Sequence, residues 1–214
     1  MVSALVITII NAALRTVIQR LSLYEKHDTL TNHRVSVASK LLFARFTNTA
    51  IVPILVSRSF SDWQREGGLV GDIFYLMLSL AFVDPIMYLI NANNLIKRFK
   101  RFLERRKGAN SQLTQAQANE LFEGPRVDMA NLLSNTANML LTAIFYAPLI
   151  PITIPIALVG MCFSYWVDKF NLFRIHRVPE MINGVLPIFF ANLLPYFALL
   201  WSLSYFFIFG ELIT

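Results

Sequence analysis

Six long apolar stretches, separated by polar or charged segments, organise this sequence. Each approaches the ~20 residues that an α-helix needs to cross the hydrocarbon core of a bilayer. We therefore predict an all-α fold in which residues 1–214 form one polytopic transmembrane helical bundle. The predicted spans are residues 2–23, 37–57, 70–92, 127–147, 149–168 and 185–209, and residues 93–126 form a cytoplasmic linker.

Basic residues are concentrated in alternate loops. The first, third and fifth loops carry several lysines and arginines, the second has only Arg58 and Arg65, which nearby acids offset, and the fourth has none. Because cytoplasmic loops are enriched in basic residues, these three loops are predicted to be cytoplasmic and both termini to lie outside. A chain that starts outside with a partly polar helix resembles an excerpt, so we expect further helices before Met1 and after Thr214.

Four of the predicted spans carry a stripe of polar residues. The fourth span places four of them on one helical face: Asn131, Asn135, Asn138 and Thr142. The other three stripes are Thr8, Asn11, Arg15 and Gln19; Arg45, Asn48 and Thr49; and Asp84, Tyr88 and Asn91. Such residues either hydrogen-bond between helices or line a hydrophilic path, and four partly polar helices favour the path. The pore-lining or gating candidates are Asp84, Pro85, Tyr88, Asn91, Asn131, Asn135, Asn138, Thr142 and Asn48.

Asp84 lies inside an apolar stretch, directly before Pro85. A charge at bilayer depth costs ~2.5–3.5 kcal/mol even on the mildest scale, so it usually faces a bundle interior or a water-filled path. Two interpretations stay open. Asp84 and Pro85 form a hinge beside the path, or they form a static kink in which Asp84 pairs with Arg15 or Arg45.

Residues 93–107 predict a basic amphipathic helix that lies at the level of the lipid headgroups. Its basic residues would attract anionic lipid at ~1 kcal/mol each. The lipid-binding candidates are Lys97, Arg98, Lys100 and Arg101. A simple cytoplasmic anchor and a target for a calmodulin-like protein are the alternatives. Further along, Thr114 and Gln117 predict a capping box for a short helix that Gly124 and Pro125 end.

The composition agrees with a membrane protein. Of the 214 residues, 56% are hydrophobic and 15% are charged, whereas soluble domains carry roughly 25% charged residues. The net charge of +6 is attributed to cytoplasmic loops and anionic lipid, and no nucleic-acid partner is expected. The single Cys162 excludes an internal disulfide framework and a cysteine metal cluster. No metal site and no cofactor are expected.

The sequence offers little for catalysis. It contains no dinucleotide-binding glycine motif, P-loop, nucleophile elbow or zinc-protease motif. His27, His33 and His176 have no convergent acid or cysteine partner, so each is interpreted as a surface histidine. We therefore do not expect an enzyme.

Two segments resemble the superfamily of anoctamins, OSCA channels and TMC proteins. Residues 24–55 resemble its linker and the following helix, with matches at Glu25, His27, Thr29, Lys40, Phe43, Phe46 and Asn48. Residues 146–179 resemble its proline-rich hairpin and the following helix, with matches at Asp168, Lys169, Arg177 and Pro179. The motifs are individually loose, and their order and spacing carry the resemblance.

The resemblance implies an all-helical pore domain, usually in a homodimer with one conduction path per subunit. The chain would cover the fourth to ninth of about ten membrane helices and so be a partial pore domain. Anoctamins that calcium activates carry acidic ligands on three helices. The matching neighbourhoods hold Ile86, Ile90, Thr136, Met139 and Ser164, and only Asp168 is acidic. Since Ca²⁺ needs six to eight oxygens with several carboxylates, that site is expected to be absent, which favours the OSCA-like branch of stress-gated cation channels.

The sequence thus predicts the pore-domain portion of a mechanosensitive cation channel. The alternatives are a phospholipid scramblase of the same superfamily and a non-conducting structural membrane subunit. The expected partners are the bilayer, anionic headgroups, permeating cations and a second copy of the chain. The expected location is the plasma membrane or an internal eukaryotic membrane, as a multi-pass protein.

Overall fold

The computed structural model describes residues 2–22, 24–56, 63, 65, 67–90, 92–108, 111–125, 127–177 and 184–213. Side chains are described for these residues except 2–6, 8, 12, 92–95, 98 and 211–213. The predictions for Asn91 and Pro179, and for the side chains of Thr8 and Arg98, therefore lie outside the described part of the chain.

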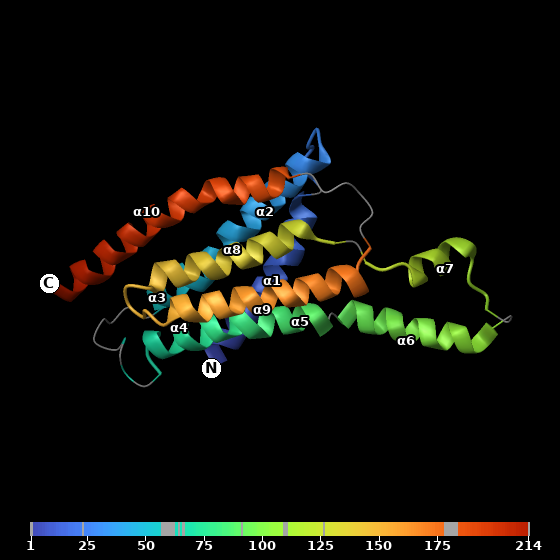
Figure 1. Cartoon of the computed structure of the whole chain (residues 1–214), viewed down its shortest axis with the longest axis horizontal. Helices are drawn as coiled ribbons and strands as arrows, with labels where there is room; N and C mark the ends of the chain where they lie inside the picture. Colours follow the sequence, from blue (N-terminus) through green and yellow to red (C-terminus); the bar gives the residue numbers. More distant parts are fainter. Residues whose placement is uncertain are drawn as a thin grey trace.

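The described part of the chain is organised into α-helices and two short π-helical segments, η1 and η3 (Figure 1). Their bounds are α1 Val2–Ser22, α2 Leu30–Phe46, η1 Thr47–Ile51, α3 Val52–Val56, α4 Leu69–Leu78, η3 Ser79–Val83, α5 Asp84–Ile90, α6 Ala92–Lys107, α7 Gln115–Phe122, α8 Met129–Tyr146, α9 Thr153–Arg174 and α10 Val185–Ile213.

Six long helical stretches occupy the positions of the six predicted spans, because α2, η1 and α3 run on as one helix and so do α4, η3 and α5. Three stretches in the described chain are long and apolar enough to cross a membrane, namely Leu30–Val56, Leu69–Ile90 and Val185–Gly210. The protein is therefore an all-α polytopic helical membrane protein, as predicted. The number of spans stays a prediction.

Some helices extend beyond the predicted spans. α2 begins at Leu30 because the Thr29 hydroxyl caps it and accepts a hydrogen bond from the Asn32 backbone at 3.2 Å. α9 continues to Arg174, past the apolar stretch. A helix satisfies its own backbone in water as well as in lipid, so helix ends do not fix where a span ends.

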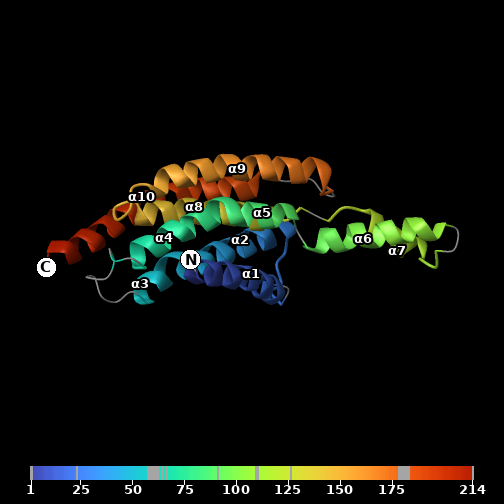
Figure 2. The same ribbon diagram turned by 90° about the horizontal axis from the view of Figure 1, so that it is seen from below.

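α8 lies in the middle of the bundle. It packs against α2 on one side and against α9 and α10 on others (Figures 1 and 2). The α1–α2 linker, α6 and α7 lie toward one end of the bundle, whereas the α8–α9 turn and the C-terminus lie toward the other. These connections between helices therefore lie at alternate ends of the bundle, as the loop charges predict. The side of the membrane on which each end lies stays a prediction.

Each π-helical segment ends two residues before a proline. The N–H of Val52 bonds to the carbonyl of Thr47 ahead of Pro53, and the N–H of Asp84 bonds to the carbonyl of Ser79 ahead of Pro85. Proline has no N–H and its ring crowds the carbonyl of the preceding turn, so a wider turn relieves both problems. The helix around Asp84 is therefore locally irregular.

The local predictions between the spans are confirmed. Thr114 and Gln117 form the reciprocal capping box of α7, which ends at Phe122, shortly before Gly124 and Pro125. The amphipathic helix predicted over residues 93–107 is α6. The proline-rich segment forms the tight turn between α8 and α9, where the Thr153 hydroxyl donates to the carbonyl of Ile150 at 2.9 Å.

Candidate intramembrane polar site

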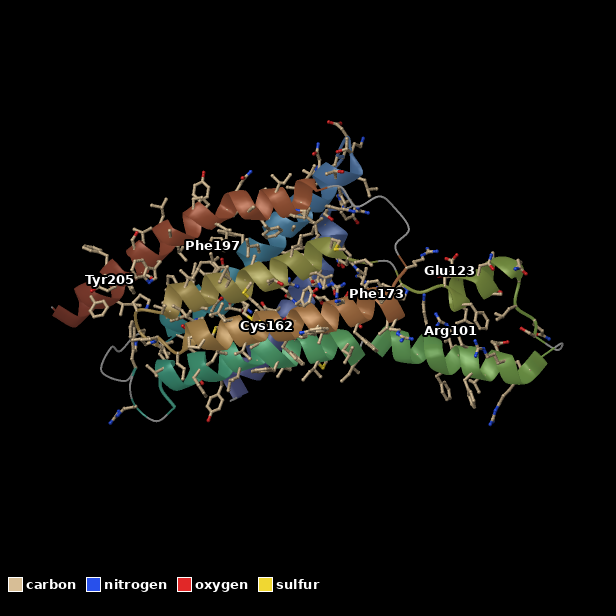
Figure 3. All side chains as sticks on the ribbon, in the orientation of Figure 1. Arg101, Glu123, Cys162, Phe173, Phe197 and Tyr205 are labelled. Carbon is tan, nitrogen blue, oxygen red and sulfur yellow. The ribbon has the colours of Figure 1, made fainter. Side chains whose placement is uncertain are left out.

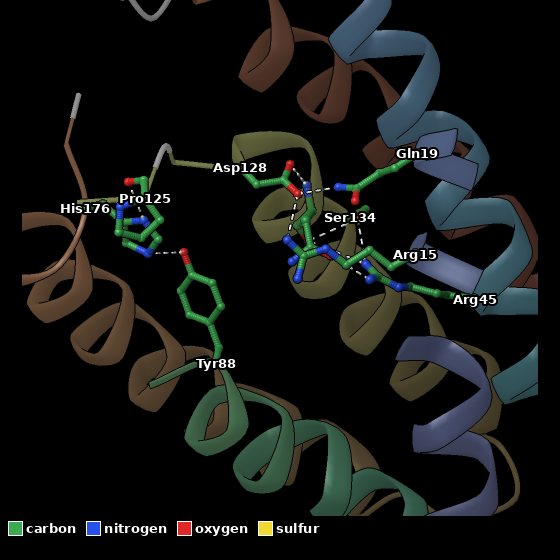
Figure 4. A network of polar contacts seen from close by, with 9 residues as sticks. Arg15, Gln19, Arg45, Tyr88, Pro125, Asp128, Ser134 and His176 are labelled. Atoms are coloured by element: carbon green, nitrogen blue, oxygen red, sulfur yellow. Dashed lines mark hydrogen bonds and ion pairs between the residues drawn. The ribbon is translucent and has the colours of Figure 1, made fainter. Parts of the chain in front are cut away.

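A buried arginine joins α2 to α8. Arg45 is only 4% exposed, and its guanidinium donates to Oδ1 of Asn131 at 2.7 Å and to the hydroxyl of Ser134 at 2.8 Å (Figure 4). Neutral acceptors on α8 thus accept hydrogen bonds from this buried guanidinium. Hydrogen bonds to a charged group are among the stronger ones, so Arg45 fixes how α2 lies on α8.

The same contact continues toward the other end of the two helices. The Thr49 hydroxyl lies 3.2 Å from Oδ1 of Asn138 and 3.2 Å from the hydroxyl of Thr142. Asn48 extends the network to α1 by donating to Oδ1 of Asn11 at 3.0 Å. We call this network, which comprises Asn11, Arg45, Asn48, Thr49, Asn131, Ser134, Asn138 and Thr142, the α2–α8 seam.

The α2–α8 seam holds four of the pore-lining candidates: Asn48, Asn131, Asn138 and Thr142. Their side chains are buried and bonded to other helices. None of the four lines the small cavity beside Asp84. In this arrangement they join helices, which is the first of the two roles that such polar stripes can have.

Asp128 joins α1 to the start of α8, at the end of the bundle nearest α6. Its carboxylate accepts from Arg15 at 3.0 Å and from Gln19 at 2.7 Å, and it caps α8 by accepting from the Asn131 backbone at 3.1 Å (Figure 4). Asp128 is not among the residues of the predicted polar stripes. Its position directly before an apolar helix is the N-cap signal that could have identified it.

Asp84 pairs with neither of the two arginines that were considered for it. Arg15 pairs with Asp128, and Arg45 bonds within the α2–α8 seam. Arg45 lies within electrostatic reach of Asp84, but Asp84 has no hydrogen bond or ion pair among the residues that the structure describes. The paired form of the static kink is therefore absent from this structure.

Asp84 borders a small polar cavity between α5, α8 and α9. The cavity has a volume of about 30 Å³, which is enough for an ordered water. Two carboxylates face it, those of Asp84 and Asp168. Its other polar lining residues are Tyr88, Asn135, Thr136 and Ser164, and its apolar ones are Leu80, Pro85, Leu132 and Met139. We call it the acidic cavity.

Asn135 therefore faces different surroundings from the other three residues of the α8 stripe. It lines the acidic cavity, whereas Asn131, Asn138 and Thr142 point into the α2–α8 seam. The acidic cavity brings together five of the sequence candidates or matches, namely Asp84, Pro85, Tyr88, Asn135 and Asp168.

Tyr88 and His176 lie between the acidic cavity and a larger cavity next to α6. The Tyr88 hydroxyl and Nε2 of His176 are 2.9 Å apart, and the two rings stack with centroids 5.6 Å apart. His176 also contacts the carbonyl of Pro125 through Nδ1 at 3.2 Å (Figure 4). His176 is thus half-buried and ordered by partners, so its interpretation as a surface histidine was wrong.

The basic residues of α6 divide into two groups. Lys97 and Lys100 line the larger cavity. Arg101 instead donates to the carbonyls of Leu121 at 2.6 Å and Glu123 at 3.0 Å, and so joins α6 to the end of α7 (Figure 3). Arg101 is therefore held by backbone acceptors, which the charge pattern alone could not show.

The described residues do not fit a resident calcium site of the anoctamin kind. Two carboxylates, those of Asp84 and Asp168, share the acidic cavity. Over the described ranges, no three or more histidine, cysteine or acidic residues come together in a way that could hold a metal ion. Calcium sites draw on several carboxylates.

A comparison with protein families gives one match that covers most of the chain. A family model described as "calcium-dependent channel, 7TM region, putative phosphate" matches residues 1–194. Among curated proteins, none matches the chain.

Proposed function

The chain belongs to the family of calcium-dependent channels with a seven-transmembrane region, and we propose that it forms the core of a cation-conducting channel that membrane tension opens. Membership supports the OSCA-like part of the resemblance and a channel-type integral membrane protein. Cation selectivity, mechanical gating, the wider link to anoctamins and TMC proteins, and the status of a partial pore domain belong to the proposal.

The acidic cavity is the observation that carries this proposal. Asp84 and Asp168 both line one small cavity between three helices. Asp84 lies inside an apolar stretch, where an unpaired charge is expensive. Rings or pairs of acidic side chains are a common way for channels to favour cations. The uncharged oxygens of Asn135 and Ser164 can replace part of a cation's hydration shell.

The proposed path follows α5, α8 and α9 rather than the α2–α8 seam. The seam is hydrogen-bonded along its length, and opening it would strand the Arg45 charge. Among the described residues, one hydrogen bond joins a lining residue of the acidic cavity to another part of the bundle, that of Tyr88 with His176 beyond the end of α9. The cavity is also bordered by the irregular turn of η3. The proposed pore-lining residues are therefore Asp84, Pro85, Tyr88, Asn135 and Asp168. The four candidates that lie in the α2–α8 seam would support the wall of the path.

Tension would act through the irregular helix formed by α4, η3 and α5. A π-helical turn followed by proline has fewer regular backbone hydrogen bonds to lose, so it bends more easily than the flanking helix. When the bilayer thins and widens, α5 would move away from α9 and enlarge the acidic cavity. The closed form corresponds to the small cavity of this structure.

A second cavity favours the scramblase as an alternative. It has a volume of about 520 Å³ and a mostly apolar lining from α8, α9 and the start of α10, and Asp168 and Lys169 are its charged lining residues. It shares Tyr88, Thr136 and Asp168 with the acidic cavity. A mostly apolar cavity with a few charged and polar lining residues suits a lipid that moves its headgroup along the bundle.

Reconstitution of the full-length protein in liposomes tests both functions. Current under suction and flipping of a fluorescent phospholipid are recorded from the same preparation. The channel proposal expects a tension-evoked cation current that Asp84→Asn and Asp168→Asn reduce, while flipping stays at the level of empty liposomes. Flipping without current would support the scramblase, and neither activity would support the structural subunit.

We also propose that the protein acts as a homodimer in the plasma membrane or an internal eukaryotic membrane. α10 supports a contact with lipid or with a second copy, because many of its large apolar side chains are exposed. They include Leu199, Leu203, Phe206 and Phe207. Cross-linking of the protein in native membranes, followed by measurement of its mass, tests the dimer.

A further inference from the structure

A large cavity lies where α6 and α7 meet the end of the bundle. Its volume is about 1040 Å³. α6 and α7 form one side, and the other side is formed by Arg15, Tyr88, Pro125, Asp128 and His176. Figure 1 shows α6 and α7 at the end of the bundle, near the start of α8 and the end of α9. We call it the basic cavity.

Several charged groups of the basic cavity are already paired. Arg15 pairs with Asp128 at 3.0 Å, and Lys107 pairs with Glu104 at 2.7 Å. Hydrogen bonds from Lys107 and Ser111 lower the pKa of Glu104, which keeps that pair ionised. Arg106 lies over the ring of Phe102 at 4.6 Å. These groups have partners within the chain, so they contribute less to the binding of an anion.

Two ammonium groups have no partner among the described residues. Lys97 and Lys100 both line the basic cavity, and neither has a hydrogen bond or ion pair with a described residue. They lie three residues apart on α6, so they occupy adjacent turns of one helical face. Glu120 is the acidic lining residue outside the two pairs. The cavity therefore has an excess of positive charge centred on Lys97 and Lys100.

The walls of the basic cavity are held in place. Arg101 joins α6 to α7 through the carbonyls of Leu121 and Glu123, and Arg105 lies over the ring of Phe122 at 5.7 Å. Ile96, Leu103, Leu113 and Leu121 supply apolar lining between the charges. A fixed, partly apolar setting strengthens the attraction between a cation and a bound anion.

We propose that the basic cavity binds a phosphate group that carries up to two negative charges, with Lys97 and Lys100 as its cationic ligands. A phosphate group offers several strong acceptor oxygens and up to two negative charges, which match two ammonium groups on adjacent turns. The cavity lies where the predicted headgroup-level helix meets the bundle, so a phosphomonoester lipid headgroup, as in phosphatidic acid, and free phosphate are the two sources of this chemistry. The proposal does not depend on whether the protein conducts ions.

Direct binding to the full-length protein in detergent tests the proposal. The probes are dioctanoyl phosphatidic acid, inorganic phosphate and, as a zwitterionic control, dioctanoyl phosphatidylcholine, each titrated at 150 mM salt. We expect phosphatidic acid to bind and Lys97→Gln/Lys100→Gln to weaken it about thirtyfold, equivalent to about 2 kcal/mol for two basic contacts. Competition by inorganic phosphate would identify the phosphate group as the recognised feature. If phosphatidic acid binds and inorganic phosphate does not compete, the ligand is a lipid rather than free phosphate.

Two further variants separate a site from general surface charge. Lys26→Gln/Arg20→Gln removes the same number of charges from exposed residues that do not line the basic cavity, and it should leave binding within about twofold. Leu113→Trp fills the cavity without changing charge, and it should weaken binding while the protein elutes normally on size exclusion. The proposal would be overturned if the control double variant lost as much binding as Lys97→Gln/Lys100→Gln. It would also be overturned if phosphatidylcholine bound as well as phosphatidic acid, or if Leu113→Trp bound phosphatidic acid fully.

Discussion

Asn131 and Asn135 lie one turn apart on α8 and yet face different surroundings. Four residues advance an α-helix by 400°, which leaves a 40° offset from the starting direction. Asn138 and Thr142 return closer to the direction of Asn131, so these three fill the α2–α8 seam. Asn135 stands at the edge of the stripe and lines the acidic cavity instead.

This difference makes a matched pair of substitutions informative. Asn131→Leu removes the 2.7 Å acceptor of the buried Arg45 guanidinium and should lower the free energy of unfolding by about 2–3 kcal/mol. Asn135→Leu breaks no hydrogen bond with a described residue and should change it by less than ~0.5 kcal/mol. Thermal unfolding in detergent measures both. Arg45→Met combined with Asn131→Leu should recover stability, and equal effects of the two single changes would contradict the seam.

Asp84 is the residue on which conduction should depend. It makes no ion pair among the described residues, so Asp84→Asn should express and fold close to the wild type. If the acidic cavity lies on the ion path, the same change should lower cation conductance and weaken the preference for cations over anions, as measured by reversal potentials in liposome patches.

The matched control for this change is Asp128→Asn. It keeps the cap of α8 but weakens the bonds to Arg15 and Gln19, so it should lower stability by roughly 1 kcal/mol. Poor expression of Asp84→Asn with rescue by Arg45→Gln would show instead that Asp84 balances Arg45 over a longer distance. That result would remove Asp84 from the path.

At the scale of elements, the close approach of α9 to η3 depends on a glycine. A Cβ on Gly160 would lie 2.6 Å from Cβ of Ala81, 2.8 Å from its Cα and 3.0 Å from the sulfur of Met139. Real side chains do not approach so closely, so the backbone would have to separate. Gly160 thus allows α9 to pack directly on the irregular turn that precedes Asp84.

Gly160→Ala should therefore force α9 and η3 apart and cost about 1–3 kcal/mol of stability. Gly71→Ala in α4 is the control, since a Cβ there meets no atom within 4 Å and should stabilise the helix by roughly 0.5–1 kcal/mol. The unfolding midpoints of the two variants are compared in detergent. If this contact also holds the channel closed, Gly160→Ala should lower the tension that opens it, and an unchanged threshold would separate packing from gating.

At the scale of the whole molecule, the predicted topology places the two ends of the bundle on opposite sides of the membrane. Gln112→Cys, before α7, and Ile152→Cys, in the α8–α9 turn, should react with an impermeant thiol reagent from opposite sides. Cys162 is exposed and must first be changed to Ser. Reaction of both positions from the same side would contradict the alternation of loops.

The sequence alone determined the helical elements and the class of protein. Apolar length, the capping residues around Thr114, and the proline and glycine stops act locally or through the bilayer, so their effect can be inferred without knowing which helices touch. The placement of the basic amphipathic helix α6 and the proline-rich turn followed from the same local rules.

The tertiary structure decided the partners. Arg45 bonds to Asn131 and Ser134, Arg15 pairs with Asp128, and Asp84 shares a cavity with Asp168. A periodic stripe shows which residues share a face, but not which neighbour that face meets, because rotation and sliding of packed helices set the partner. For that reason the sequence could name Asp84 and the α8 stripe together, and only the packing of α2 and α9 against α8 could separate them.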